Sequence, residues 1–223
     1  FGTDLDASLR FAGAHVDRVR HVYGIGWLAW DKRRWKEDSE GRVAQLAKES
    51  ARAWTLAAVR GNDQTREQRI RSAMGLESSG HIHASVDLAR CDPRLVLPIG
   101  DLDRDPWVLN VENGTLDLRT GTLRPHRRAD MITKLAPVTF DAEARHPTLD
   151  RYLAGIEAHT PGMMAFLARC IGAALSGNAD VESLFLVQGE GGSGKTTLLE
   201  AWAAMLGDYS VKLAFESFCT SGH

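Results

Sequence analysis

Apolar residues recur at helical spacing through the first ninety or so residues. This pattern predicts helices over residues 4–19, 43–60, from 63 or 65 to about 74, and 79–89. Asp4 is expected to cap the first of these helices. Between the first two helices, the runs 27–30 and 34–36 read as short strands on either side of a turn at 31–33. The first part of the chain is therefore expected to be mainly helical, with one hairpin.

The pattern changes character after Pro93. Short alternating runs at 108–111, 115–118 and 122–123 are separated by the turn signals Asn113-Gly114 and Thr120-Gly121. Asn-Gly favours the positive backbone angles of a tight hairpin. The sequence therefore predicts a small β-meander, with a continuation into residues 132–135.

A polar, apolar-poor stretch at residues 141–147 reads as a linker. Two helices are expected after it, at 148–158 and from Thr160 to about 177, the second capped by Thr160 with Pro161 in its first turn. The apolar run 184–188 then predicts a buried parallel strand, residues 196–206 a helix, and residues 210–213 a further strand. The expected fold is an α+β N-terminal domain over 1–145, followed by the start of an α/β P-loop domain over 146–223.

A phosphate-loop motif lies between the expected strand and helix. Residues 189–196 read GEGGSGKT, which fits G-x-x-x-x-G-K-[ST] in the strand–loop–helix setting that the pattern requires. Glycine lets the backbone approach an anion closely, and a helix N-terminus adds partial positive charge. Lys195 is expected to reach the β- and γ-phosphates of ATP, and the Thr196 hydroxyl to bind Mg²⁺. The expected nucleotide-binding residues are Gly189, Gly191, Gly192, Ser193, Gly194, Lys195 and Thr196.

Composition narrows the class of protein. With 43% hydrophobic and 25% charged residues, the chain has the make-up of a soluble globular protein. A net charge of −2 gives no overall basic field, so any nucleic-acid surface must be local. The three cysteines are far apart, which suits a reducing cytosol, and no apolar run approaches about 18 residues. A membrane partner is not expected.

Several motifs in this order resemble the phage and plasmid primase–helicase family of superfamily-three helicases, which is related to poxvirus primase–helicases. The first motif is the hairpin GWLAWDKRRWKED at residues 26–38. It is followed by WVLNVENGTLDL at 107–118, RTG at 119–121, PH at 125–126 and ITK at 132–134. The helical pair and the P-loop come last. The resemblance implies a DNA-unwinding AAA+ motor, fuelled by ATP and Mg²⁺ and assembled as a ring, usually a hexamer. It also implies a role in replicating mobile elements in the cytoplasm of a bacterial host.

Carried onto this sequence, the resemblance places Gly189, Gly194, Lys195 and Thr196 in the nucleotide site, with Lys195 and Thr196 catalytic and Thr197 at the α-phosphate. The family's second acidic motif, sensor and arginine finger follow the P-loop and have no counterpart after Thr197. The chain opens on Phe1 rather than Met and ends soon after the motif, so we expect it to be a piece of a longer protein or a chain with its ends removed. Phosphoryl transfer needs a metal holder, a water-orienting group and an arginine, so the piece alone is not expected to hydrolyse ATP at a useful rate.

Two basic clusters are candidate DNA contacts. Arg33, Arg34 and Lys36 surround Trp35, a combination that can track phosphates and stack a base; the alternative is a hairpin whose tryptophans fill a core. Arg127 and Arg128 belong to a second cluster, for which phosphate contact and a solvated face are both open readings.

Two functions follow. The first is the ATP-binding portion of a replicative DNA helicase. The alternative is a DNA-binding or ring-assembling module that carries a non-catalytic P-loop remnant.

Overall fold

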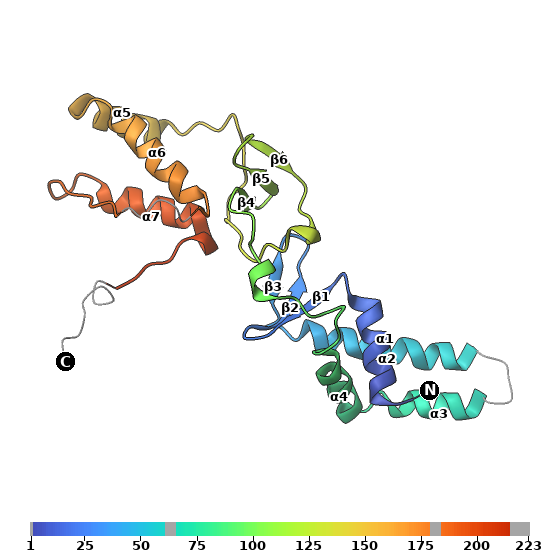
Figure 1. Cartoon of the computed structure of the whole chain (residues 1–223). Helices are drawn as coiled ribbons and strands as arrows, with labels where there is room; N and C mark the ends of the chain where they lie inside the picture. The colour runs from blue at the N-terminus through green and yellow to red at the C-terminus, as the bar shows by residue number, and fades with distance from the viewer. Residues whose placement is uncertain (1, 61–65, 179–183, 215–223) are drawn as a thin grey trace, which may run out of the picture. The chain divides into compact units, whose positions relative to one another are not determined.

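The computed structural model describes residues 2–60, 66–178 and 184–214. The chain folds as two compact units, Phe1–Leu102 and Asp103–His223 (Figure 1). The predicted division between residues 145 and 146 falls within the second unit and stays a prediction. Within the described residues, no helix is long and apolar enough to cross a membrane.

The first unit combines four helices with a three-stranded antiparallel sheet (Figure 1). The strands β1 (Val19–Val22), β2 (Gly26–Trp30) and β3 (Trp35–Glu37) pair in sequence order. The helices are α1 (Asp4–His15), α2 (Arg42–Arg60), α3 (Arg66–Gly75) and α4 (Ser79–Ala89), and a short 3₁₀ turn, η1, spans Ile99–Asp101. Apolar side chains from α1, β1, α2 and α4 form one core, which excludes water from Phe11, Val19, Leu46 and Leu95.

Three of the four predicted helices of this unit end where the sequence indicated. The prediction for the first was wrong, because α1 stops at His15 and Val19–Val22 form β1. Val19 and Val22 are fully buried and belong to a strand that pairs with β2, so helical spacing beyond His15 was coincidental. The cap is also one residue earlier than expected, since the Thr3 hydroxyl accepts from the Asp6 N–H at 3.2 Å. The predicted start of the third helix lies outside the described residues.

The second unit opens with the expected meander. Strands β4 (Val108–Val111), β5 (Gly114–Asp117) and β6 (Thr122–Arg124) are antiparallel, and the 3₁₀ turn η2 (Arg128–Asp130) follows. The continuation at 132–135 is not a strand; one parallel bridge joins Val111 to Ala136 instead. Gly114 has no room for a side chain, because a Cβ there would lie 2.5 Å from the Arg124 carbonyl oxygen.

Three helices complete the second unit: α5 (Pro147–His159), α6 (Met163–Leu175) and α7 (Lys195–Leu206), the last followed by the 3₁₀ turn η3 (Gly207–Tyr209). The helix predicted from Thr160 begins instead at Met163. Its N-terminus is capped by Glu157, whose carboxylate accepts from Gly162 N at 2.7 Å and Met164 N at 2.8 Å. These two bonds lower the pKa of Glu157. Neither α5 nor α6 buries any side chain completely.

The two strands predicted around the P-loop are not formed. Residues 184–188 have no strand assignment, and Leu184 and Leu186 are 80% and 86% exposed. Residues 210–213 are likewise outside any strand. A parallel strand needs a neighbouring strand to satisfy its backbone, and the described residues of this unit place none beside either segment. The α+β class is confirmed for the chain, with two small antiparallel sheets.

Candidate nucleotide-binding site

The predicted phosphate loop forms a tight turn that leads directly into α7. Gly192 and Gly194 have φ angles of +80° and +81°, a region that favours glycine. The Ser193 hydroxyl donates to the Glu190 carbonyl oxygen at 2.9 Å and closes the turn. α7 starts at Lys195, one residue earlier than predicted, with Gly194 as its N-cap.

The Lys195 ammonium is folded back onto the loop. It donates to the carbonyl oxygens of Gly189 at 2.9 Å and Glu190 at 2.6 Å, and to the Ser193 hydroxyl at 2.8 Å. The loop therefore already wraps around one positive charge at the start of a helix. The first N–H groups of a helix have no partner within it, and its dipole favours anions at that end. A cation and free backbone donors in one place are what a polyphosphate requires.

The structure thus brings Gly189, Ser193 and Lys195 together by direct bonds. Gly191 and Gly192 lie in the exposed turn, and Thr196 and Thr197 are exposed in the first turn of α7. No group of three or more metal-ligating side chains exists among the described residues. Thr196 alone would supply one oxygen ligand, which fits Mg²⁺, because that ion commonly keeps several waters and takes further ligands from substrate phosphates.

A tyrosine from α5 supports the loop from outside. The Tyr152 hydroxyl donates to the Ser193 carbonyl oxygen at 3.2 Å. Its ring lies over Gly194, where a Cβ would stand 2.8 Å from Tyr152 Cε2. The sequence predicts a helix over residues 148–158, but nothing in the spacing of Tyr152 relates it to residues about forty positions later.

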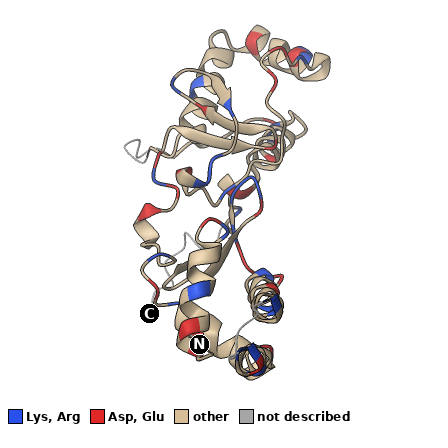
Figure 2. Cartoon of the chain, turned by 90° about the vertical axis from the view of Figure 1, so that its right-hand side faces the viewer, with Lys and Arg blue, Asp and Glu red and all other residues tan. Residues whose placement is uncertain are grey.

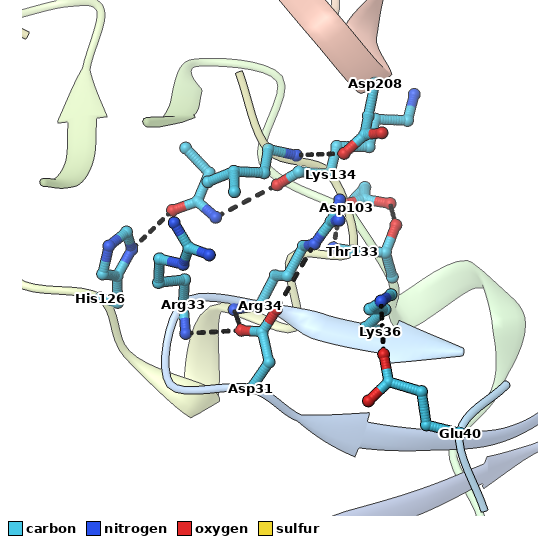
Figure 3. A network of polar contacts seen from close by, with 12 residues as sticks. Asp31, Arg33, Arg34, Lys36, Glu40, Asp103, His126, Thr133, Lys134 and Asp208 are labelled. Carbon is cyan, nitrogen blue, oxygen red and sulfur yellow. Dashed lines mark hydrogen bonds and ion pairs between the residues drawn. The ribbon is translucent and has the colours of Figure 1, made fainter. Parts of the chain in front are cut away.

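The far end of α7 is anchored on the meander (Figure 3). Asp208 accepts from the Leu135 N–H at 3.0 Å, and its own N–H donates to the Leu135 carbonyl oxygen at 3.3 Å. The Tyr209 hydroxyl accepts from the Asn110 N–H at 3.1 Å, and the Lys134 ammonium lies 5.7 Å from the centre of the Tyr209 ring. The C-terminal end of α7 is therefore attached to the β4–β6 sheet.

Asn110 is the centre of this attachment. It is fully buried in β4; its side chain donates to the Lys134 carbonyl oxygen at 3.1 Å and accepts from the Thr115 hydroxyl at 3.1 Å. His126 Nδ1 lies 2.8 Å from the Asn110 side-chain oxygen, so that nitrogen carries the proton and donates (Figure 3). Asp103 fixes the neighbouring segment by accepting from the Thr133 N–H at 2.7 Å. A buried polar network with its bonds satisfied specifies one geometry.

The first candidate DNA cluster is a structured turn in the first unit. The Asp31 carboxylate accepts from the N–H groups of Arg33 and Arg34, each at 2.8 Å, and Lys36 pairs with Glu40 at 3.2 Å (Figure 3). Trp35 is 1% exposed and therefore cannot stack a base. The core interpretation of Trp35 is thus confirmed, and the Arg20 guanidinium covers its ring at 5.4 Å.

The second cluster lies around β6 and η2 in the second unit. Arg124 forms a two-pronged ion pair with Asp130, at 2.7 and 3.1 Å, and Arg119 stacks over Trp107 at 5.1 Å. Arg127 and Arg128 are exposed at the start of η2. Elsewhere, basic and acidic residues are interspersed along the helices (Figure 2).

The described residues form helices and two small antiparallel sheets, with the phosphate-loop sequence at the start of α7. Residues 8–156 match the family described as D5 N terminal like, the N-terminal region of phage and viral primase–helicase proteins. Because this match covers more than half of the chain, the chain belongs to that family. No curated protein matches it. The matched residues end within α5, before the loop.

Proposed function

We propose that the chain is the ATP-binding portion of a DNA helicase of the primase–helicase type, used to replicate a phage, plasmid or other mobile element. Membership of the D5 N-terminal-like family supports the replication role. The observation that carries the ATP site is the Lys195 ammonium, held by three loop oxygens at the start of α7. This is the charge and backbone arrangement that a triphosphate tail needs.

In this proposal each residue has a separate task. The backbone of Gly189, Gly191, Gly192, Ser193 and Gly194 wraps the phosphates. Lys195 exchanges its three loop oxygens for β- and γ-phosphate oxygens, which form stronger, charge-assisted hydrogen bonds. Thr196 contributes a hydroxyl to Mg²⁺, and Thr197 lies at the α-phosphate. When bound there, Mg²⁺ would supply positive charge to offset the charge that develops on the phosphate oxygens.

The wider assembly belongs to the same proposal. The superfamily-three assignment implies a homo-oligomeric ring, a hexamer, acting on DNA as an ATP-dependent helicase in the cytoplasm of a bacterial host. Arg33, Arg34, Lys36, Arg127 and Arg128 are the proposed phosphate contacts. Of these, Lys36, Arg127 and Arg128 are exposed, whereas Arg33 and Arg34 are half-buried beside the Asp31 turn.

A second candidate is a DNA-binding or ring-assembling module with a P-loop that performs no catalysis. One observation favours it: the family match ends at residue 156, so the part of the chain that defines the family does not include the loop.

Nucleotide binding decides between the two. A fluorescent ATP analogue is titrated with Mg²⁺ into the wild-type chain, Lys195→Ala and the control Lys212→Ala, whose ammonium is 74% exposed. Loss of a charge-assisted contact to phosphate predicts a fall in affinity of at least about 10-fold for Lys195→Ala and none for Lys212→Ala. A wild-type chain that binds DNA but no nucleotide supports the second candidate instead.

A further inference from the structure

We infer that Tyr152 is a positioning residue for the phosphate loop, fixing the direction of the backbone N–H of Gly194. This inference rests on the proposed nucleotide site and adds to it a residue from a different helix. Tyr152 touches no phosphate in this assignment. It acts through the loop backbone, by holding the Ser193 carbonyl group at 3.2 Å.

The peptide group between Ser193 and Gly194 links the Tyr152 hydroxyl to the orientation of the Gly194 N–H. In a trans peptide the C=O and the next N–H lie in one plane and point in opposite directions. With the Ser193 oxygen directed at Tyr152, the Gly194 N–H is directed away from it. That N–H immediately precedes α7 and belongs to the run of backbone donors that a phosphate loop presents.

The ring of Tyr152 adds a second constraint at Gly194. A Cβ there would stand 2.8 Å from Cε2 and 3.0 Å from the hydroxyl oxygen, so the backbone lies directly against the aromatic ring. The last glycine of the motif is therefore required for two reasons, its φ of +81° and the tyrosine above it. Both contacts restrict the same peptide.

Other side-chain bonds of the described loop are internal to it. Ser193 Oγ bonds Glu190, and Lys195 bonds Gly189, Glu190 and Ser193. Such bonds shape the loop but do not place it relative to the rest of the unit. The three Lys195 bonds are also the ones that this residue must exchange when phosphate binds, whereas the Tyr152 bond can persist.

The helix that carries Tyr152 is itself fixed at both ends. Pro147 starts α5, and His146 Nδ1 accepts from the Leu149 N–H at 3.3 Å. At the other end, Glu157 caps the start of α6 through Gly162 N. A tyrosine has only two side-chain torsions to order, so a half-buried ring on such a helix is a stiff support.

The test compares wild-type chain with Tyr152→Phe, Tyr152→Ala and the control Arg151→Ala, an exposed neighbour on α5. Amide hydrogen exchange is measured first without nucleotide. Both Tyr152 variants are expected to exchange faster across residues 189–196 while α6 and the meander are unchanged, with Tyr152→Phe intermediate because it keeps the ring. Unchanged exchange across the loop in Tyr152→Ala overturns the inference.

Binding of ATP and of inorganic pyrophosphate is then measured for the same proteins. A positioning role predicts that both ligands lose affinity by one common factor, about 2- to 10-fold for loss of the hydroxyl. Loss for ATP but not for pyrophosphate shows that Tyr152 contacts the nucleoside, and overturns the inference. If the wild-type chain binds neither ligand, the proposed nucleotide site fails, while hydrogen exchange still decides whether Tyr152 orders the loop.

Discussion

The Tyr209 hydroxyl accepts a hydrogen bond from the backbone N–H of Asn110 at 3.1 Å, joining residues 99 positions apart. Asn110 is fully buried in β4, and Tyr209 ends the turn that follows α7. The bond therefore ties the helix of the candidate nucleotide loop to the sheet that lies within the family-matched region.

Replacing Tyr209 with Phe removes the acceptor but keeps the ring against Lys134. A buried N–H that loses its acceptor costs about 1–3 kcal/mol, so the free energy of unfolding should fall by about that amount. Urea denaturation followed by tryptophan fluorescence measures it. Tyr23→Phe, at a tyrosine that is 61% exposed, is the matched control and should change little. Equal unfolding midpoints for the two variants would contradict a stabilising Tyr209 bond.

Gly207→Ala should release the end of α7. The backbone angles of Gly207, φ +52° and ψ −118°, are favourable only for glycine, and a Cβ at this position would lie 2.3 Å from Pro137 Cδ. We expect a loss of about 1–3 kcal/mol in unfolding free energy, with faster hydrogen exchange at residues 207–209. Gly172→Ala is the opposite case: it lies in α6 with open space around it and should stabilise by about 0.5–1 kcal/mol. Stabilisation by both substitutions would show that the Gly207 contact is not tight.

The first unit should lose stability as the pH falls. Burial lowers the pKa of His15 from its usual value of 6.5, and the positive charge of Arg18 lowers it further. Burial and the positive charge of Arg90 lower the pKa of His21 in the same way. His15 lies against Ser50, with Nε2 at 2.7 Å from its hydroxyl, and the Nδ1 atoms of both rings make no hydrogen bond in the described chain. As the pH falls below about 6.5, both histidines become protonated in the unfolded chain but stay neutral in the folded one. The free energy of unfolding therefore declines until the pH has passed below the folded-state pKa values.

Urea titrations at about pH 7.5 and about pH 5 measure this decline. With His15→Gln and His21→Gln combined, the difference between the two pH values should shrink, whatever the absolute stability of the variant. His83→Gln, at an exposed histidine, should leave the difference unchanged. If the double variant still shows the full difference in unfolding free energy between the two pH values, other titratable groups cause that difference.

The double variant Arg127→Gln/Arg128→Gln tests the proposed DNA contacts. If each guanidinium neutralises one phosphate of a single strand, the slope of log affinity against log salt should fall by about 0.7 per residue. Fluorescence anisotropy with a labelled oligonucleotide at several salt concentrations gives that slope. Arg52→Gln, whose guanidinium pairs with Glu77 at 3.3 Å, is the control. An unchanged slope in the double variant would place the contacts elsewhere.

Local patterns predicted the elements that depend on local chemistry. The helix 79–89 and the strand 108–111 have the observed bounds, because periodicity and turn residues decide them. β1 was missed because Val16 and Val19 are three residues apart, as on a helix face, and only pairing with β2 shows Val19 to be a strand. The strand predicted at 184–188 failed for the converse reason: its apolar run is suited to a sheet, and a sheet needs partners.

In the candidate site, too, the local features could be predicted from the sequence and the long-range contacts could not. GEGGSGKT predicts the loop and Lys195, since the backbone angles and the ammonium are properties of that stretch. Tyr152, Asp208 and Tyr209 carry no sequence signal, because each acts on residues far away along the chain. Their roles follow only from the three-dimensional contacts.

Tyr152 and Tyr209 hold the two ends of α7. Its twelve residues span about 18 Å, with Tyr152 against the peptide that precedes its first turn and Tyr209 fastened to β4 just beyond its last. A helix behaves as a stiff rod over this length. A ligand that displaces the loop would therefore act on both attachments, the one at Tyr152 and the one at Tyr209.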